Sequence, residues 1–270
     1  MPIDEQSLTA LLTQLREFQQ QISIDSLSIG QRRRLESLSQ KAISELRDLI
    51  TAIDPIKLPE LVYNPTDPDT FAEAIGNKLM VQDEHQLRDL ESHRFYGSGL
   101  YALYYHGEFS AYQPIRGTAT PIYVGKADPP KGAKTPREQG DRLWKRLREH
   151  AGSIREVESY CAKVGIPGNI KLDEFAFRYL VTASGWQVAA EGHLISLFRP
   201  IWNKEINVVR GIGKHGDDSE TRANERSRWD TLHPGRDWAT HAGNQPNRLA
   251  VSDIEEMILK HFTDYPPKHL

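Results

Sequence analysis

The chain has 270 residues, of which 38% are hydrophobic and 26% are charged, and its formal net charge is −3. No stretch approaches the run of about 18 apolar residues that a membrane-spanning helix needs, and the first five residues lack the pattern of a signal peptide. The single cysteine, Cys161, excludes an internal disulfide, and no cysteine–histidine cluster has zinc spacing. These features favour a globular, cytoplasmic protein with no membrane partner.

Two amphipathic helices are predicted at the N-terminus. Residues 5–22 place apolar side chains at helical spacing, and a second apolar stripe covers residues 35–53. Pro55 ends the second helix, because proline disfavours the helical conformation of the residue before it. We expect residues 1–58 to form a helical hairpin that packs on the core, pairs two subunits, or clasps DNA through the three arginines at 32–34.

The remaining residues, 59–270, are predicted to form one domain with a core at about 97–207 and a C-terminal extension at 208–270. Its first part, Pro59–Asp69, holds three prolines and is predicted to be a loop. The predicted elements of the core and the closing helix are strands at Leu100–His106, Pro121–Ala127 and Asp173–Thr182 and helices at Arg137–His150, Trp186–Phe198 and Val251–Phe262. This order predicts a mixed α/β fold of the α+β class, in which helices flank a small, mainly antiparallel central sheet.

Basic residues concentrate between positions 131 and 148 despite the negative net charge. The segment contains only two acidic residues, Glu138 and Asp141, and seven basic ones: Lys131, Lys134, Arg137, Arg142, Lys145, Arg146 and Arg148. Such a segment either neutralises nucleic-acid phosphates or forms a solvated helix face. A second basic segment, Gly211–Gly216, matches a dinucleotide-binding fingerprint, but no apolar helix follows it, so we interpret it as a turn.

Two short motifs lie on the first two predicted strands of the core. They are Gly99-Leu100-Tyr101 and Ile122-Tyr123-Val124-Gly125. Together they resemble the paired elements of the GIY-YIG nucleases, with leucine and valine in place of the two central isoleucines. The resemblance continues in order through Arg146 and His150, four residues apart on one helix face, Glu191 in the next helix, and Asn203 after it. It covers roughly residues 97–207.

Each of these residues also has a structural interpretation. Tyr101 and Tyr123 are ordinary strand residues, Arg146 could form a surface ion pair, His150 could cap its helix, and Asn203 could hydrogen-bond a turn. Glu191 is harder to explain in this way, because it lies beside two alanines and a leucine, where a carboxylate needs a partner. Their order and spacing favour the functional interpretation.

The resemblance implies a metal-dependent endonuclease mechanism. Glu191 would bind one divalent cation, Mg²⁺ with Mn²⁺ as a substitute, and Arg146 would donate to the phosphate. Tyr123 would position the phosphate or the attacking water, Tyr101 would be the general base with His150 assisting, and Asn203 would support the arrangement by hydrogen bonding.

The segment Trp229–Arg236 resembles a signature of a restriction-enzyme branch of these nucleases. This implies a type II restriction endonuclease that cuts double-stranded DNA at a short palindrome as a homodimer, beside a DNA methyltransferase that it need not contact. Alternatives are a repair or homing nuclease of the same superfamily and a non-catalytic DNA-binding relative. The candidate DNA contacts are Lys131, Lys134, Arg142, Lys145, Arg222, Arg226, Arg228 and Arg236.

Overall fold

A computed structural model describes residues 5–22, 27–54, 56, 67–183, 185–213, 226–240 and 246–268 of the chain. These residues divide into two compact units, Met1–Tyr63 and Asn64–Leu270. The predicted hairpin boundary and most of the predicted loop Pro59–Asp69 lie outside the described residues. No helix within the described ranges has the length and apolar composition needed to cross a membrane.

The N-terminal unit contains the two expected helices, α1 (Glu5–Gln21) and α2 (Ile29–Ile53). A capping box starts α2, because Ser28 Oγ accepts the backbone N–H of Gln31 while the Gln31 side chain accepts that of Ser28. The apolar stripes of both helices are exposed, and Phe18 on α1 and Ile50 on α2 retain 55% and 61% of their surface.

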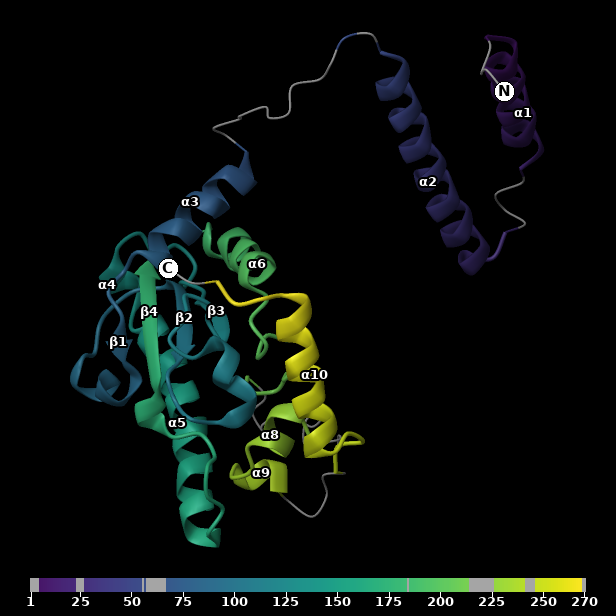
Figure 1. Cartoon of the computed structure of the whole chain (residues 1–270). Coiled ribbons are helices and arrows are strands. Elements are labelled where there is room, and N and C mark those ends of the chain that lie inside the picture. The colour runs from purple at the N-terminus through teal and green to yellow at the C-terminus, as the bar shows by residue number, and fades with distance from the viewer. Residues whose placement is uncertain are drawn as a thin grey trace. The chain divides into compact units, whose positions relative to one another are not determined.

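The second unit is built on an antiparallel sheet with the strand order β1-β4-β2-β3 (Figure 1). The strands are β1 (His85–Gln86), β2 (Gly99–Tyr105), β3 (Tyr123–Ala127) and β4 (Phe175–Val181). Every residue of β2 is buried, and alternate side chains enter two different apolar clusters, with Tyr101 and Leu103 in one and Leu100 and Ala102 in the other. Both faces of the sheet are therefore covered, which confirms the predicted α+β fold.

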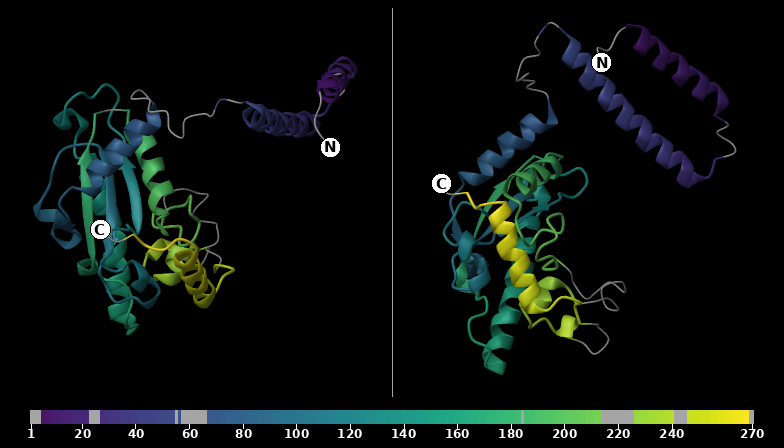
Figure 2. Two further views of the ribbon diagram at one scale, coloured as in Figure 1. Left: turned by 45° about the horizontal axis from the view of Figure 1, so that its top comes forward. Right: turned by 45° about the vertical axis from the view of Figure 1, so that its right-hand side comes forward.

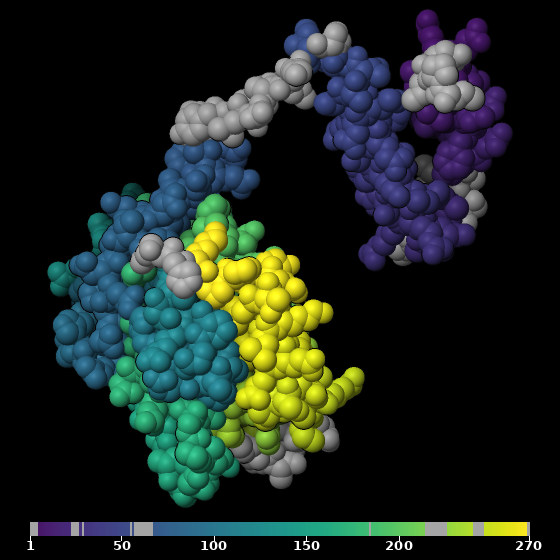
Figure 3. Space-filling view, viewed as in Figure 1, coloured from purple at the N-terminus to yellow at the C-terminus, as the bar shows by residue number. Residues whose placement is uncertain are grey.

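Helices cover the two faces of the sheet. α3 (Pro68–Met80) and α6 (Gln187–Phe198) pack side by side on one face, and α5 (Arg142–Val164) packs against the other (Figure 2). The C-terminal helix α10 (Val251–Asp264) lies on the surface beside the 3-10 helix η3 (Ser110–Ile115) (Figure 3). The remaining elements are η2 (Leu87–Ser92), α4 (Pro136–Gln139), η4 (Leu172–Glu174), α8 (Arg228–Leu232) and α9 (Asp237–Thr240).

Three regions of the chain contain α-helices that differ from the sequence prediction. α3 was not predicted, and its first two residues fall in the predicted loop Pro59–Asp69. Pro68 occupies the first turn, where its missing N–H costs nothing, and Asp67 caps the helix. The helix predicted at Arg137–His150 is instead the short α4 and the longer α5, separated by Gly140, whose φ is 71°. The C-terminal extension, in which only the helix Val251–Phe262 was predicted, also contains α8 and α9.

Candidate active site

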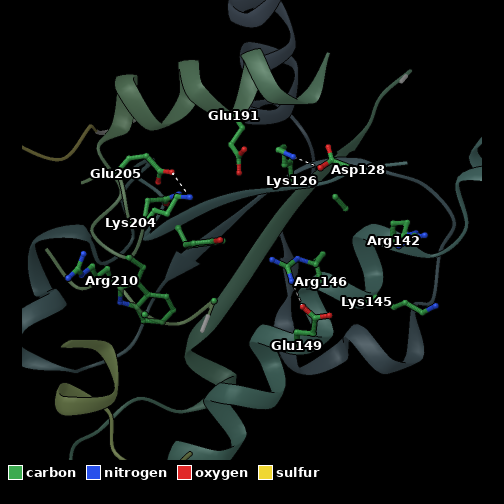
Figure 4. A pocket seen from close by; sticks show the side chains of 16 residues that line it. Lys126, Asp128, Arg142, Lys145, Arg146, Glu149, Glu191, Lys204, Glu205 and Arg210 are labelled. Atoms are coloured by element: carbon green, nitrogen blue, oxygen red, sulfur yellow. Dashed lines mark hydrogen bonds and ion pairs between the residues drawn. The ribbon is translucent and has the colours of Figure 1, made fainter. Parts of the chain in front are cut away.

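A cavity of about 840 Å³ lies beside β3 and α6, and four of the six predicted site residues line it: Tyr123, Arg146, Glu191 and Asn203. The other two, Tyr101 and His150, lie behind this lining and are fully buried. Figure 4 shows two groups of charged side chains on opposite sides of the cavity. We call Arg142, Lys145, Arg146 and Glu149 the α5 wall, and Lys204, Glu205 and Arg210 the loop wall.

The glycines of both motifs are required by close contacts. Gly99 has a φ of 145°, and a Cβ atom there would lie 2.2 Å from the carbonyl oxygen of Leu180 on β4. At Gly125, a Cβ atom would lie 2.5 Å from the Tyr101 hydroxyl. Gly99 therefore allows β2 and β4 to pair, and Gly125 leaves room for the Tyr101 side chain beneath β3.

The two tyrosines and His150 form a connected group. The Tyr101 hydroxyl lies 2.7 Å from His150 Nε2, and the rings of Tyr101 and Tyr123 pack together with their centroids 6.0 Å apart. β2 supplies Tyr101, β3 supplies Tyr123, and α5 supplies His150, one turn after Arg146. The group leads from the buried imidazole to the one tyrosine that lines the cavity.

Burial makes both phenols harder to ionise. It raises the pKa of Tyr101 well above its usual value, and the neighbouring Tyr123 adds to this effect, whereas the positive charge of Arg146 lowers it. Burial also raises the pKa of Tyr123, and Arg146 again lowers it. Either tyrosine must lose its own proton before it can act as a base, and nearby positive charge favours that ionised form.

Arg146 is held by a neighbour on its own helix. Its Nη1 donates to Glu149 Oε2 at 2.5 Å, three residues further along α5. The side chain points into the cavity (Figure 4), where the rest of its planar donor group faces the space between the two walls. This arrangement fixes a guanidinium close to both tyrosines.

Glu191 extends from α6 into the cavity (Figure 4). Burial raises the pKa of its carboxyl to about 7, and Glu205 and Asp128 contribute to this, while Lys126 and Lys204 act in the opposite direction. Within the described residues, Glu191 has no hydrogen-bond or ion-pair partner. A bound cation would stabilise the charged form of such a half-buried carboxyl.

The carboxylate of Glu191 suits a divalent cation that prefers oxygen ligands, such as Mg²⁺. Among the described residues, no three His, Cys, Asp or Glu side chains converge on one point. Mg²⁺ commonly uses one or two carboxylates and completes its shell with water and substrate phosphates. Glu191 in an open, polar cavity matches that requirement.

Asn203 extends the hydrogen-bonding pattern of the sheet at β3. Its Oδ1 accepts the backbone N–H of Val124 at 2.9 Å, and its Nδ2 donates to the Val124 carbonyl at 2.8 Å. The adjacent Trp202 N–H donates to the Ile122 carbonyl at 3.1 Å. Asn203 therefore fixes the backbone that follows Tyr123, and the backbone of Trp202 holds the residue that precedes it.

The structure distributes the predicted DNA contacts unevenly. Arg142 and Lys145 line the cavity, whereas Lys131 and Lys134 are exposed outside it. Arg226 and Arg228 donate to backbone carbonyls, at Ala239 and at Asn207 and Val208 respectively. Arg222 lies outside the described residues.

Arg236 does not fit the predicted role of base reading. It is 1% exposed, and its guanidinium forms two hydrogen bonds with Asp230, at 2.7 and 2.8 Å. A side chain enclosed in this way cannot reach a DNA groove. This burial corrects the expectation for Arg236, whose sequence context gave no indication of its position in the fold.

Several charged residues of the cavity were missed by the sequence analysis: Lys126, Asp128, Glu149, Lys204, Glu205 and Arg210. Lys126 and Asp128 directly follow the second motif, and Lys204 and Glu205 directly follow Asn203. Adjacency to a motif was therefore a usable signal for these four. Arg210 had no such signal, because the backbone between it and Asn203 is irregular.

A family model of the Eco29kI GIY-YIG domain matches residues 93–262. This range includes both motif strands, the helices that carry Arg146 and Glu191, Asn203 and the tail signature. The chain belongs to this family. The Eco29kI domain is a restriction endonuclease member of the GIY-YIG superfamily, so the predicted family and its nuclease class are confirmed. Comparison with curated proteins gives no significant match.

Proposed function

We propose that the protein is a type II restriction endonuclease, which hydrolyses phosphodiester bonds of double-stranded DNA at a short palindrome with one divalent metal ion per active site. The main support is the convergence of Tyr123, Arg146, Glu191 and Asn203 on one cavity within a chain of the Eco29kI family. The cationic side chains of both walls suit a phosphate backbone that must enter this cavity.

Glu191 is the proposed metal ligand, with Mg²⁺ as the natural ion and Mn²⁺ as a substitute. When bound, the cation would polarise the phosphate and stabilise the departing 3′ oxygen. Glu191 supplies the negative charge for this site, and its pKa is raised mainly by burial, which the positive charges of Lys126 and Lys204 offset only in part.

The other residues bind the phosphate and move the proton. Arg146 donates from its planar fork to nonbridging oxygens, with Glu149 fixing its orientation. Tyr123 contacts the attacking water, because its hydroxyl is the one of the pair that lines the cavity. Tyr101 passes its own proton to His150 Nε2, 2.7 Å away, and the resulting phenolate accepts the proton of the water through Tyr123.

Double-strand cleavage would use two copies of this site. One site cuts one strand, and a palindrome is matched by a two-fold homodimer. The exposed apolar stripes of α1 and α2 support self-association, since large exposed apolar patches commonly mark interaction surfaces. A companion DNA methyltransferase would protect the host DNA without binding this protein.

The test of the metal assignment is Glu191→Gln, which keeps the shape of the side chain but removes its charge. We expect plasmid cleavage in Mg²⁺ to fall by about 10³-fold, the loss of several kcal/mol of transition-state stabilisation that a catalytic metal supplies. Binding to the same DNA should persist. Glu256→Gln, on the exposed face of α10, is the matched control. Near-normal cleavage by Glu191→Gln would disprove the assignment.

The oligomeric proposal is tested by sedimentation on DNA that contains the recognition site. A dimer that converts supercoiled plasmid to linear product supports the restriction function. A monomer that leaves nicked circles as its final product would instead favour the repair class.

A further inference from the structure

The loop wall is fixed from behind by a buried ion pair. Arg236 and Asp230 are 1% and 2% exposed, and the guanidinium lies over the rings of Trp229 and Trp238 at 4.6 and 4.9 Å. Nε donates to Asp230 Oδ1 at 2.7 Å, and Nη2 donates to Oδ2 at 2.8 Å. The forked geometry gives this arginine a single orientation.

The remaining donors of Arg236 hold a backbone segment. Nη1 donates to the Ile212 carbonyl at 2.9 Å, and Nη2 donates to the Gly211 carbonyl at 2.8 Å. The backbone N–H of Trp229 donates to the Arg210 carbonyl at 3.2 Å. Three consecutive carbonyls, from Arg210 to Ile212, are therefore bound by one cluster of tail residues.

The sequence of this segment is fitted to the same cluster. Gly211 has a φ of 133°, and a Cβ atom there would lie 2.1 Å from Ser227 Oγ, which itself donates to Asp230 at 2.5 Å. Ile212 is 1% exposed, so its side chain anchors the segment in the core. Any displacement of Arg236 would move these residues together.

The other side of the segment faces the catalytic cavity. Arg210, Gly211 and Gly213 line it, and Arg210 is exposed. In Figure 4, Arg210 and Lys204 lie on the side of the cavity away from Arg142 and Lys145. A DNA strand that enters between the walls would meet cationic side chains on both sides.

We propose that Arg210 contacts a backbone phosphate of the DNA substrate, and that Arg236 is a positioning residue which holds Arg210 in place. This inference rests on the proposed function, because it assigns the cavity to DNA. A phosphate is the chosen target because Arg210 shares its cavity with the proposed metal ligand and Arg146, which act on phosphate. A base contact would give a different experimental result.

The test measures binding of a fluorescent duplex that contains the recognition site and of an unrelated duplex, in Ca²⁺, over a range of salt concentrations. Arg210→Ala should weaken both duplexes to the same extent and reduce the slope of log K against log salt by about 1. Arg88→Ala, an exposed arginine outside the cavity, should leave the slope unchanged. A loss confined to the specific duplex would show a base contact and overturn the phosphate assignment.

The positioning role is tested with Arg236→Lys, which keeps the charge but loses the fork, and with Gly211→Ala, which displaces the segment directly. Each should reduce the salt slope as Arg210→Ala does, and neither should reduce it further in combination with Arg210→Ala. Lower thermal stability with an unchanged slope in both variants would make Arg236 purely structural and overturn the proposal.

A cleavage assay of the wild-type protein in Mg²⁺ separates this inference from the function on which it rests. Wild-type protein that binds DNA without cutting it would contradict the nuclease proposal, while the slopes still decide the role of Arg210. Wild-type protein that binds neither duplex would overturn both.

Discussion

Two tyrosine–histidine pairs lie in the interior of the nuclease unit. Tyr101 and His150 are 2.7 Å apart, Tyr112 and His233 are 2.6 Å apart, and all four side chains are fully buried. Distance and burial alone do not distinguish them. We assign only the first pair to catalysis, and the reason lies in what surrounds each pair.

The pair of Tyr112 and His233 belongs to a closed chain of hydrogen bonds. Trp202 Nε1 donates to the Tyr112 hydroxyl at 2.9 Å, and His233 Nδ1 lies 2.7 Å from Asn169 Oδ1. Because that oxygen only accepts, His233 donates from Nδ1 and accepts at Nε2 from Tyr112. Asn169 then donates to the Leu232 carbonyl at 3.2 Å, so the phenol of Tyr112 and both ring nitrogens of His233 have hydrogen-bond partners.

The pair of Tyr101 and His150 instead connects to the cavity. Tyr123 continues the group to the cavity lining, and the charge of Arg146 lowers the pKa of both tyrosines against the effect of burial. The comparison shows that a hydrogen-bonded Tyr–His pair becomes a candidate for catalysis through its access to substrate and charge. The pair of Tyr112 and His233 stabilises the fold.

The largest expected difference between the pairs is in paired tyrosine variants. Tyr101→Phe should slow single-turnover cleavage by about 10²–10⁴-fold, because it removes the proposed base while keeping the ring. Tyr112→Phe should leave the rate of the folded protein unchanged but lower the free energy of unfolding by about 1–3 kcal/mol, because Trp202 and His233 lose a buried partner. Urea denaturation measures the second effect. Similar behaviour of the two variants would remove the distinction.

The charge near the catalytic pair is tested at Arg146. We expect Arg146→Lys to reduce the cleavage rate by about 10²-fold or more, nearly as much as Arg146→Ala, because an ammonium cannot reproduce the planar fork. Single-turnover kinetics on plasmid DNA measure both variants. If lysine restores most of the rate, Arg146 contributes charge alone, and the geometric role of Glu149 loses its basis.

The sequence predicted the six candidate catalytic residues as a set, because they lie within or next to short motifs on regular elements. It predicted DNA contacts for the tail arginines but not the packing of the tail, whose contacts are non-local. His233 and Arg236 lie in a segment that resembles a restriction signature, yet the structure places them in buried networks with Tyr112, Asp230 and the carbonyl of Gly211. Spacing along the chain carries no information about such partners.

A smaller effect is expected in the coupling within the catalytic pair. If Tyr101 and His150 act as one unit, the double variant Tyr101→Phe/His150→Ala should cleave DNA little more slowly than Tyr101→Phe alone. Losses that multiply would show that the two residues serve separate steps. The corresponding cycle at Tyr112 and His233 is the control, and its coupling should appear in unfolding free energy rather than in rate.

The smallest expected effect concerns the pH dependence of stability. Burial, with a contribution from Arg236, lowers the pKa of His233 to about 3 from an ordinary value near 6.5. The unfolded chain therefore binds a proton at His233 more readily than the folded protein does. The contribution of neutral His233 to the free energy of unfolding is complete above pH 6.5. It is lost as the pH falls from 6.5 toward 3, at up to about 1.4 kcal/mol per pH unit. Protonation would also turn Nε2 into a donor facing Tyr112, which already accepts from Trp202.

His233→Gln isolates this contribution, because an amide both donates and accepts but does not titrate. Urea unfolding at pH 7, 6 and 5 should show that the wild-type protein loses about 1 kcal/mol more than the variant between pH 6 and 5. The variant is expected to be less stable at pH 7, since the amide cannot fill the ring contacts of His233 with Phe109 and Trp229. Parallel losses in the two proteins would mean that His233 does not titrate during acid unfolding. Packing of the His233 ring, and not its neutral charge state, would then account for the stability that the network contributes.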